Sequence, residues 1–361
     1  MAQIVKGQIV ALFAFDIGFE VSMEELGTLL SAMPLPRLTQ KKQTPSHLQY
    51  ARPPRVIPMG PAEPLGNLEG EIQAMVFDFG AVSIAYRWPL RADKALVSLN
   101  DLPQISQQVY GLNLESHSRK QAERLTQLIG RAIVRPELSA LVEDYYLFVI
   151  EEFETPYAGK DLLAQHRSIL AQILRFETHL LSEEQQEEAL AQRITYFQND
   201  LVLVDWNAAI IYDRDFWDTA NVLELLNVEL LEARYIDSEL DKRIGIYQGL
   251  VRRRASWLPF RIPYRNAIQE LAELRIESLV LAKRVENALK LIGDLYLARI
   301  HHAATVRFYL PDWENAISRK LDLIASFYQL LVDRVRTAQS HTLELVIIAL
   351  ILAEILLAVF R

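Results

Sequence analysis

The 361-residue chain contains no cysteine at all. This absence excludes disulfides, thiol nucleophiles, thiolate zinc sites and iron–sulfur clusters held by cysteine. A secretory signal is also missing, because the amino end carries one lysine and no apolar stretch of helix length before Asp16. A chain without disulfides or export signal suits a reducing compartment, and we therefore expect the folded body to lie in the cytoplasm.

Short catalytic motifs are missing as well. The chain has no glycine-rich phosphate loop, no paired-histidine metal motif and no serine nucleophile elbow. His301 and His302 are adjacent on a predicted helix, so their side chains diverge by about 100 degrees and do not readily share one metal ion. We therefore predict no catalytic residue, no metal and no cofactor, and we favour a protein that is not an enzyme.

Charge is unevenly distributed. The 46 acidic and 38 basic residues give a net charge of -8, which disfavours a general nucleic-acid binder. No acidic residue lies between Asp241 and Glu270, and this basic patch, 242–265, also holds aromatic side chains. Three partners remain open for it: anionic lipid headgroups, single-stranded RNA, or the acidic surface of the chain itself. Its candidate contact residues are Arg252, Arg253, Arg254, Trp257, Phe260, Arg261, Tyr264 and Arg265.

The first part of the chain, 1–214, reads as an α+β domain with a mixed sheet and covering helices. Ile9 to Val21 and Leu147 to Phe153 have the aromatic and branched residues of strands. Helices are predicted at Arg119 to Val134 and Lys160 to Glu177. Proline is dense over 34–64, and we interpret that stretch as a surface insertion.

Three aspartates in this part follow similar apolar strands. Asp16, Asp78 and Asp205 are each followed two residues later by Gly18, Gly80 or Asn207, residues that tolerate tight bends. If the three segments, each an apolar strand followed by a bend, pack around one axis, the aspartates come together and form an acidic catalytic or metal site. The alternative is that each aspartate only forms a turn.

After Asp215 the spacing of apolar residues along the sequence changes to the one that is typical of long helices. Three seams with steps of three and four begin at Leu223, Leu271 and Ile317. Seams of this length are typical of packed antiparallel helices or coiled coils, so we predict a long-helix region over 215–341. Such helices also allow a homo-oligomer or a protein partner.

The tail, 342–361, is almost entirely apolar. Of the eighteen residues Leu343 to Phe360, thirteen are Leu, Ile, Val or Phe, and only Glu344 and Glu354 are charged. As a helix the segment is about 27 Å long, close to the hydrocarbon thickness of a membrane. Its apolar side chains favour insertion by about 4 to 8 kcal/mol, against about 3 for a central acidic residue. The predicted single-pass transmembrane segment includes Leu343, Leu345, Ile348, Leu352, Glu354, Leu357 and Phe360.

Bases before the tail set its expected orientation. Arg334 and Arg336 precede the segment, whereas only Arg361 and the terminal carboxylate have to cross. This asymmetry predicts a body on the cytoplasmic side. The alternative is a soluble helical oligomer in which the tail is buried between subunits.

Three stretches together resemble the required-for-meiotic-nuclear-division family. They are Val76 to Ile84, the junction Asp215-Phe-Trp-Asp218, and Asn315 to Phe360 with a glutamate late in the span, Glu354. The resemblance implies a membrane-anchored protein without known catalysis, whose mitochondrial relatives support organelle translation by tethering ribosomes.

The function that we predict is therefore a membrane-anchored, non-catalytic scaffold or tether. It presents a cytoplasmic α+β domain to a macromolecular partner, with the translation machinery as one candidate. The alternatives are a membrane-bound enzyme that uses Asp16, Asp78 and Asp205, and the soluble helical oligomer.

Overall fold

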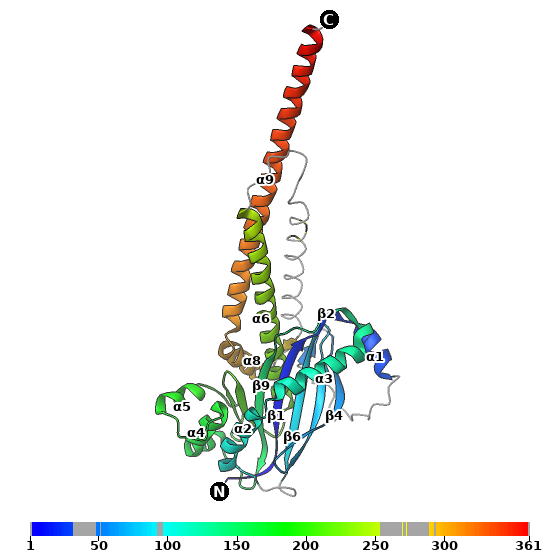
Figure 1. The fold of residues 1–361 in the computed structure, drawn as a ribbon. Coiled ribbons are helices and arrows are strands. Elements are labelled where there is room, and N and C mark those ends of the chain that lie inside the picture. The colour runs from blue at the N-terminus through cyan, green and yellow to red at the C-terminus, as the bar shows by residue number, and fades with distance from the viewer. Residues whose placement is uncertain are drawn as a thin grey trace. The chain divides into compact units, whose positions relative to one another are not determined.

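A computed structural model gives the fold of the chain (Figure 1). It describes residues 2–31, 48–50, 52–91, 97–252, 289–291 and 294–359, with residues 269 and 272. The chain forms two compact units. Unit 1 comprises Met1–Tyr235 and Arg284–Pro311, and unit 2 comprises Ile236–Lys283 and Asp312–Arg361.

A mixed, nine-stranded sheet forms the centre of unit 1, which confirms the predicted α+β class. The central strand β1 (Gln3–Asp16) is antiparallel to both β6 (Ala81–Arg91) and β9 (Glu143–Phe153). Beyond β9 lie β12 (Ala208–Tyr212), β11 (Leu201–Val204) and β10 (Gln192–Ile194); beyond β6 lie β5 (Leu68–Val76) and β4 (Arg55–Leu65). β12 is parallel to β9, and the short β7 (Val97–Ser98) pairs with β1.

Both faces of the sheet are buried. Successive side chains of β1 point to opposite faces, and apolar side chains lie on each face. Phe13 and Phe15 belong to the first core, whereas Val10 and Leu12 belong to the second. The first face carries α2 (Leu102–Gly111), α3 (Leu114–Ile129) and α4 (Gly159–Arg175). The second face carries the first part of α6 (Trp217–Arg252) and α8 (Leu295–Arg307) (Figure 1).

Smaller elements complete unit 1. Ser22 accepts a hydrogen bond from the Glu25 amide at 3.3 Å and so caps the beginning of α1 (Met23–Ser31). β2 (Gly18–Val21) pairs with β8 (Ile133–Pro136), and β3 (Leu48–Tyr50) pairs with β13 (Leu289–Leu291). The remaining elements are α5 (Glu183–Ala189) and two turns of 3-10 helix, η1 (Leu99–Asp101) and η2 (Gly130–Ala132).

The boundary between the units differs from the predicted one near residue 214. The first part of α6 belongs to unit 1 because Leu223 and Leu226 are fully buried in the second core. The segment that contains α8 also returns to unit 1, where Ile300 and Ala304 are fully buried. A helical pattern that begins at Asp215 therefore does not mark a new domain.

The proline-rich stretch also differs from the prediction of a surface insertion over 34–64. Residues 55–65 form β4, the last strand described at this edge of the sheet. Pro58 and Pro61 lie around a register shift, and Pro64 falls in a second one. Edge strands and bulges tolerate proline because they need fewer amide donors than a central strand. Residues 32–47 lie outside the described part of the chain.

Bends separate paired strands at two of the three predicted positions. Residues 77–80 connect β5 to β6, and residues 205–207 connect β11 to β12, with both pairs antiparallel. Gly80 has a φ of +98°, and a Cβ atom added there would overlap the carbonyl oxygen of Gly18. After Asp16, by contrast, the chain leaves the main sheet as β2.

In unit 2, the later part of α6 and α9 (Leu310–Val359) run in the same direction (Figure 1). Leu240, Ile244 and Tyr247 are buried on α6, as are Ile317, Ile324 and Leu331 on α9, in accord with the predicted seams. Lys320 on α9 lies 2.7 Å from both Asp237 and Asp241 on α6. The middle seam, from Leu271 onward, lies outside the described residues apart from its last member, Leu295, which begins α8.

We expect Gly80→Ala to lower the free energy of unfolding of unit 1 by at least about 2 kcal/mol, because the new methyl group meets backbone and φ is positive. Gly111→Ala is the matched control, since no atom outside its chain neighbours and its own helix backbone lies within 4 Å of the added Cβ. We expect the control to stay within about 0.5 kcal/mol of the wild type. Denaturant unfolding of both variants tests this. Equal stability would show that the Gly80 turn tolerates a side chain.

Candidate functional site

The C-terminal part of α9 is apolar and exposed. Among the described residues, α9 is the one helix long and apolar enough to cross a membrane; its most apolar eighteen-residue window has a mean hydropathy of 2.2. None of that window is buried. Within one chain, therefore, the tail is not a core helix.

The predicted membrane residues lie along this exposed helix. Leu343, Leu345, Ile348, Leu352 and Leu357 expose between 53% and 73% of their surface. Glu354 is exposed on the same helix. Phe360 lies outside the described residues. At the beginning of the segment, His341 Nδ1 lies 3.3 Å from Glu344 Oε2, which places a polar pair at this end.

The predicted basic patch, 242–265, is described only over 242–252, at the end of α6. Arg252 is the last residue of α6, and Lys242 pairs with Glu239 at 2.6 Å. Arg253, Arg254, Trp257, Phe260, Arg261, Tyr264 and Arg265 are not described. Contact of this patch with lipid or RNA stays a prediction.

The three aspartates do not form one site. Asp78 lies 3.7 Å from Arg52, Asp16 is buried near Glu232, and Asp205 is held by two arginines. Among the described residues, which include all three, no three histidine, aspartate or glutamate side chains gather closely enough to hold a metal ion. The predicted convergence is therefore wrong. Each aspartate ends a different strand or turn, and each turn takes its partners from different neighbours.

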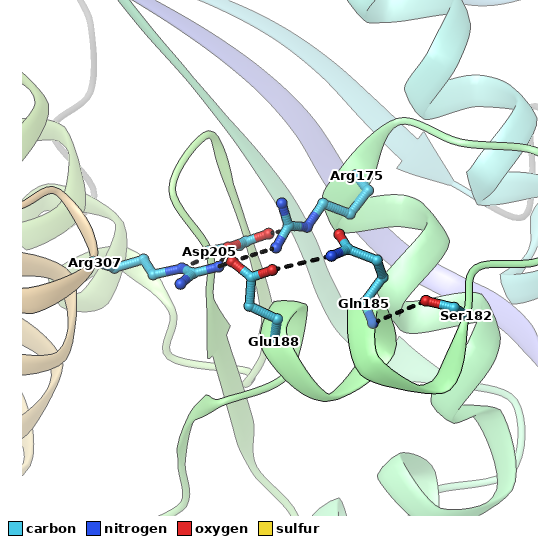
Figure 2. A network of polar contacts seen from close by, with 6 residues as sticks. All are labelled: Arg175, Ser182, Gln185, Glu188, Asp205 and Arg307. Atoms are coloured by element: carbon cyan, nitrogen blue, oxygen red, sulfur yellow. Dashed lines mark hydrogen bonds and ion pairs between the residues drawn. The ribbon is translucent and has the colours of Figure 1, made fainter.

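Asp205 is the centre of a buried ionic network (Figure 2). Its carboxylate is fully buried, and Arg307 Nε on α8 donates to Oδ1 at 2.6 Å. Arg175 Nε, at the end of α4, lies 2.8 Å from Oδ2. Glu188 on α5 lies 3.3 Å from both guanidinium groups. Figure 2 shows the two arginines reaching the carboxylates from opposite sides.

Helix capping positions Glu188 in this network. Ser182 Oγ accepts the Gln185 amide at 3.3 Å and so fixes the beginning of α5. Gln185 Nε2 then donates to Glu188 at 3.3 Å. The network thus joins α4, α5, α8 and the turn between β11 and β12.

The pKa shifts and the charge balance of the network indicate a structural role. Burial raises the pKa of Asp205, and the charges of Arg307 and Arg175 oppose this rise. Burial lowers the pKa of Arg307, but the pairs with Asp205 and Glu188 outweigh it, so the net shift is upward. Arg175 lowers the pKa of Glu188. Two positive and two negative groups neutralise one another, which leaves the network unsuited to proton transfer or metal binding.

A second set of buried polar groups lies under α6. Glu224 lies 3.9 Å from Arg87 on β6. Asn227 donates to the Glu143 carbonyl at 3.2 Å, and Arg234 forms an ion pair with the Glu143 side chain. Sequence reasoning missed these residues because they lie beside the positions of the apolar seam, where polar side chains usually face solvent.

We expect Asp205→Asn to destabilise unit 1 by about 3 to 5 kcal/mol, because the change leaves two buried guanidinium groups without their shared charge. Glu188→Gln is the control. Glu188 is 48% exposed at its side chain, so we expect it to cost about 1 kcal/mol or less. Denaturant unfolding of both variants measures the difference, and equal losses would contradict the central role of Asp205.

Comparison with known proteins places the sheet in a family. The family described as "Uncharacterized protein MJ0711, N-terminal domain" matches residues 6–218, from β1 to the beginning of α6. The uncharacterized protein MJ0711 of Methanocaldococcus jannaschii is 29% identical over 222 residues, which cover 61% of this chain and 67% of that protein. No solved structure matches. Because the match spans more than half of the sequence, the chain belongs to the MJ0711 N-terminal domain family.

Proposed function

We propose that this protein is a membrane-anchored, non-catalytic scaffold that holds its α+β domain at a membrane surface for a macromolecular partner. The observation that carries the proposal is the exposed apolar part of α9, whose eighteen-residue window is 0% buried. An exposed apolar helix of this length on a soluble monomer is unfavourable in water and marks a membrane or protein contact.

The length and composition of the window favour lipid. Eighteen helical residues span about 27 Å, which matches the hydrocarbon core of a bilayer. Exposure all around the helix also suits lipid, because a helix docked on one partner keeps a polar side. Leu343 and Leu357, at the two ends, are 65% and 73% exposed.

Charges at the beginning of the window support a cytoplasmic body. Arg334 and Arg336 precede the polar pair of His341 and Glu344, and bases on this side favour retention of the preceding chain in the cytoplasm. Glu354 lies within the proposed span, where a carboxyl group favours a hydrogen-bonding partner, such as a second copy of the chain.

A scaffold is favoured over an enzyme by the partners of the aspartates. Asp205 is the most buried of the three, and two arginines engage both of its oxygens. The resemblance to the required-for-meiotic-nuclear-division family adds the translation machinery as a candidate partner, and that identification remains a proposal.

We expect the full-length protein to stay with membranes during alkaline carbonate extraction and Ile351→Arg with Leu352→Arg to be released. Two arginines near the centre of the span cost about 5 to 7 kcal/mol, which exceeds the net gain from insertion of about 1 to 5 kcal/mol that remains after the cost of Glu354. The control is Ser326→Arg with Gln329→Arg, which adds the same charges to exposed positions on α9 before the window. Release of the wild-type protein would refute the anchor.

A second experiment addresses the partner. The full chain and a chain that ends at Ser340 are purified in detergent, and the co-purified proteins are compared by mass spectrometry. We expect a partner complex, with ribosomal proteins as the candidate, only with the anchored chain. Recovery of the same proteins with both chains would mean that the anchor plays no part in assembly.

A further inference from the structure

Two buried acidic side chains, Asp16 of β1 and Glu232 of α6, lie close enough to influence each other electrostatically. Glu232 is 1% exposed, and both of its carboxyl oxygens are buried without a hydrogen-bond partner among the described residues. Asp16, the last residue of β1, is 5% exposed. A buried carboxylate without a partner is costly, so the arrangement requires an explanation.

The sheet register places Asp16 on the face that α6 covers. Side chains alternate along β1, so Asp16 points to the same side as Val10 and Leu12, which belong to the second core. Leu223 and Leu226 of α6 belong to the same core. Asn227 and Arg234 both contact Glu143, which lies opposite Ala14 in the sheet, so the stretch of α6 that contains Glu232 lies beside the end of β1.

The neighbouring charges are engaged elsewhere. On β9, Glu143 forms an ion pair with Arg234 of α6. On β6, Arg87 lies 3.9 Å from Glu224, which is eight residues before Glu232. Glu229 and Tyr235 of α6 and Asp16 itself each have other interactions. Arg87 and Arg234 therefore each lie against a carboxylate other than Glu232.

A bound proton removes the cost of burying a second negative charge in this site. Two carboxyl groups in a buried site do not both ionise easily, and a protonated carboxyl group can donate a hydrogen bond to a carboxylate beside it. Burial, and then the charge of Asp16, raise the pKa of Glu232 well above its ordinary value. The same burial that makes an ionised Glu232 unfavourable costs a neutral one much less.

We propose that Asp16 and Glu232 bind one proton between them and that loss of this proton weakens the attachment of α6 to the sheet. The protonated Glu232 donates to the Asp16 carboxylate. Deprotonation leaves two negative charges facing each other in a site shielded from water. Because α6 continues past Tyr235 to Arg252, the site lies where the helix leaves the sheet.

The stability of the contact between α6 and the sheet should change with pH in a definite direction. A carboxyl group whose pKa is raised by folding binds its proton more tightly in the folded state, so its contribution is complete below about pH 4.3 and is lost as pH rises through the folded pKa. Stability of the contact between α6 and the sheet should therefore fall as pH rises. An ion pair made by a carboxylate predicts the opposite slope.

Native-state hydrogen exchange of residues 217–235 in the full-length protein in detergent tests this. After correction for the intrinsic exchange rate, we expect protection of the wild type to fall about tenfold per pH unit over the interval in which one proton is released on opening. Glu232→Gln should abolish the slope and should exceed wild-type protection at high pH. Glu123→Gln on exposed α3 is the control and should keep the wild-type slope.

A second variant keeps the proposal testable if Glu232→Gln does not fold. Asp16→Asn removes the facing charge but leaves Glu232 buried, so the fall in protection should end at a lower pH than in the wild type. The proposal is overturned if wild-type protection does not depend on pH, if Glu232→Gln keeps the wild-type slope, or if Asp16→Asn does not move the end of the fall.

Discussion

Burial of β1 and β6 on both faces is the constraint on which the rest of unit 1 depends. Phe13 and Phe15 need cover on one side and Val10 and Leu12 on the other, so a single layer of helices cannot close the core. The second layer comes from α6 and from α8, which the chain supplies only after residue 284. The network around Asp205 joins α8 to α4 and α5. A late segment of the chain is thus held to the fold by charge as well as by apolar contact.

Local features were predictable from the sequence because they depend on periodicity and capping. The strand at Leu147 to Phe153, the helices now seen as α3 and α4, and the serine cap of α1 follow from residues close together in the chain. Long-range pairing was not predictable. Arg307 lies 102 residues from Asp205, and no spacing in a single sequence connects them. The edge position of β4 depends on which strands lie beside it, and a single sequence does not show that. Its prolines therefore suggested a loop.

Aspartates of similar local sequence have different roles because burial and neighbours, not motif, decide their chemistry. Asp78 lies near an exposed arginine, Asp205 is neutralised by two partly buried ones, and Asp16 raises the pKa of another buried acid. The roles of the polar residues of α6 also depend on their burial and their neighbours. Glu224, Asn227 and Glu232 lie in a helix whose apolar seam was recognised, yet their partners belong to β6, β9 and β1. Only the folded sheet brings those strands under the helix.

The proline-bearing edge strand β4 has a consequence for how copies of this protein meet. Pro58, Pro61 and Pro64 have no amide hydrogen, and two register shifts interrupt the strand, so its outer edge lacks the regular row of donors that an incoming strand requires. Proteins crowded on a surface risk joining sheet to sheet into open-ended fibres. Among the described strands, β4 therefore presents an edge with which the strand of another copy pairs poorly.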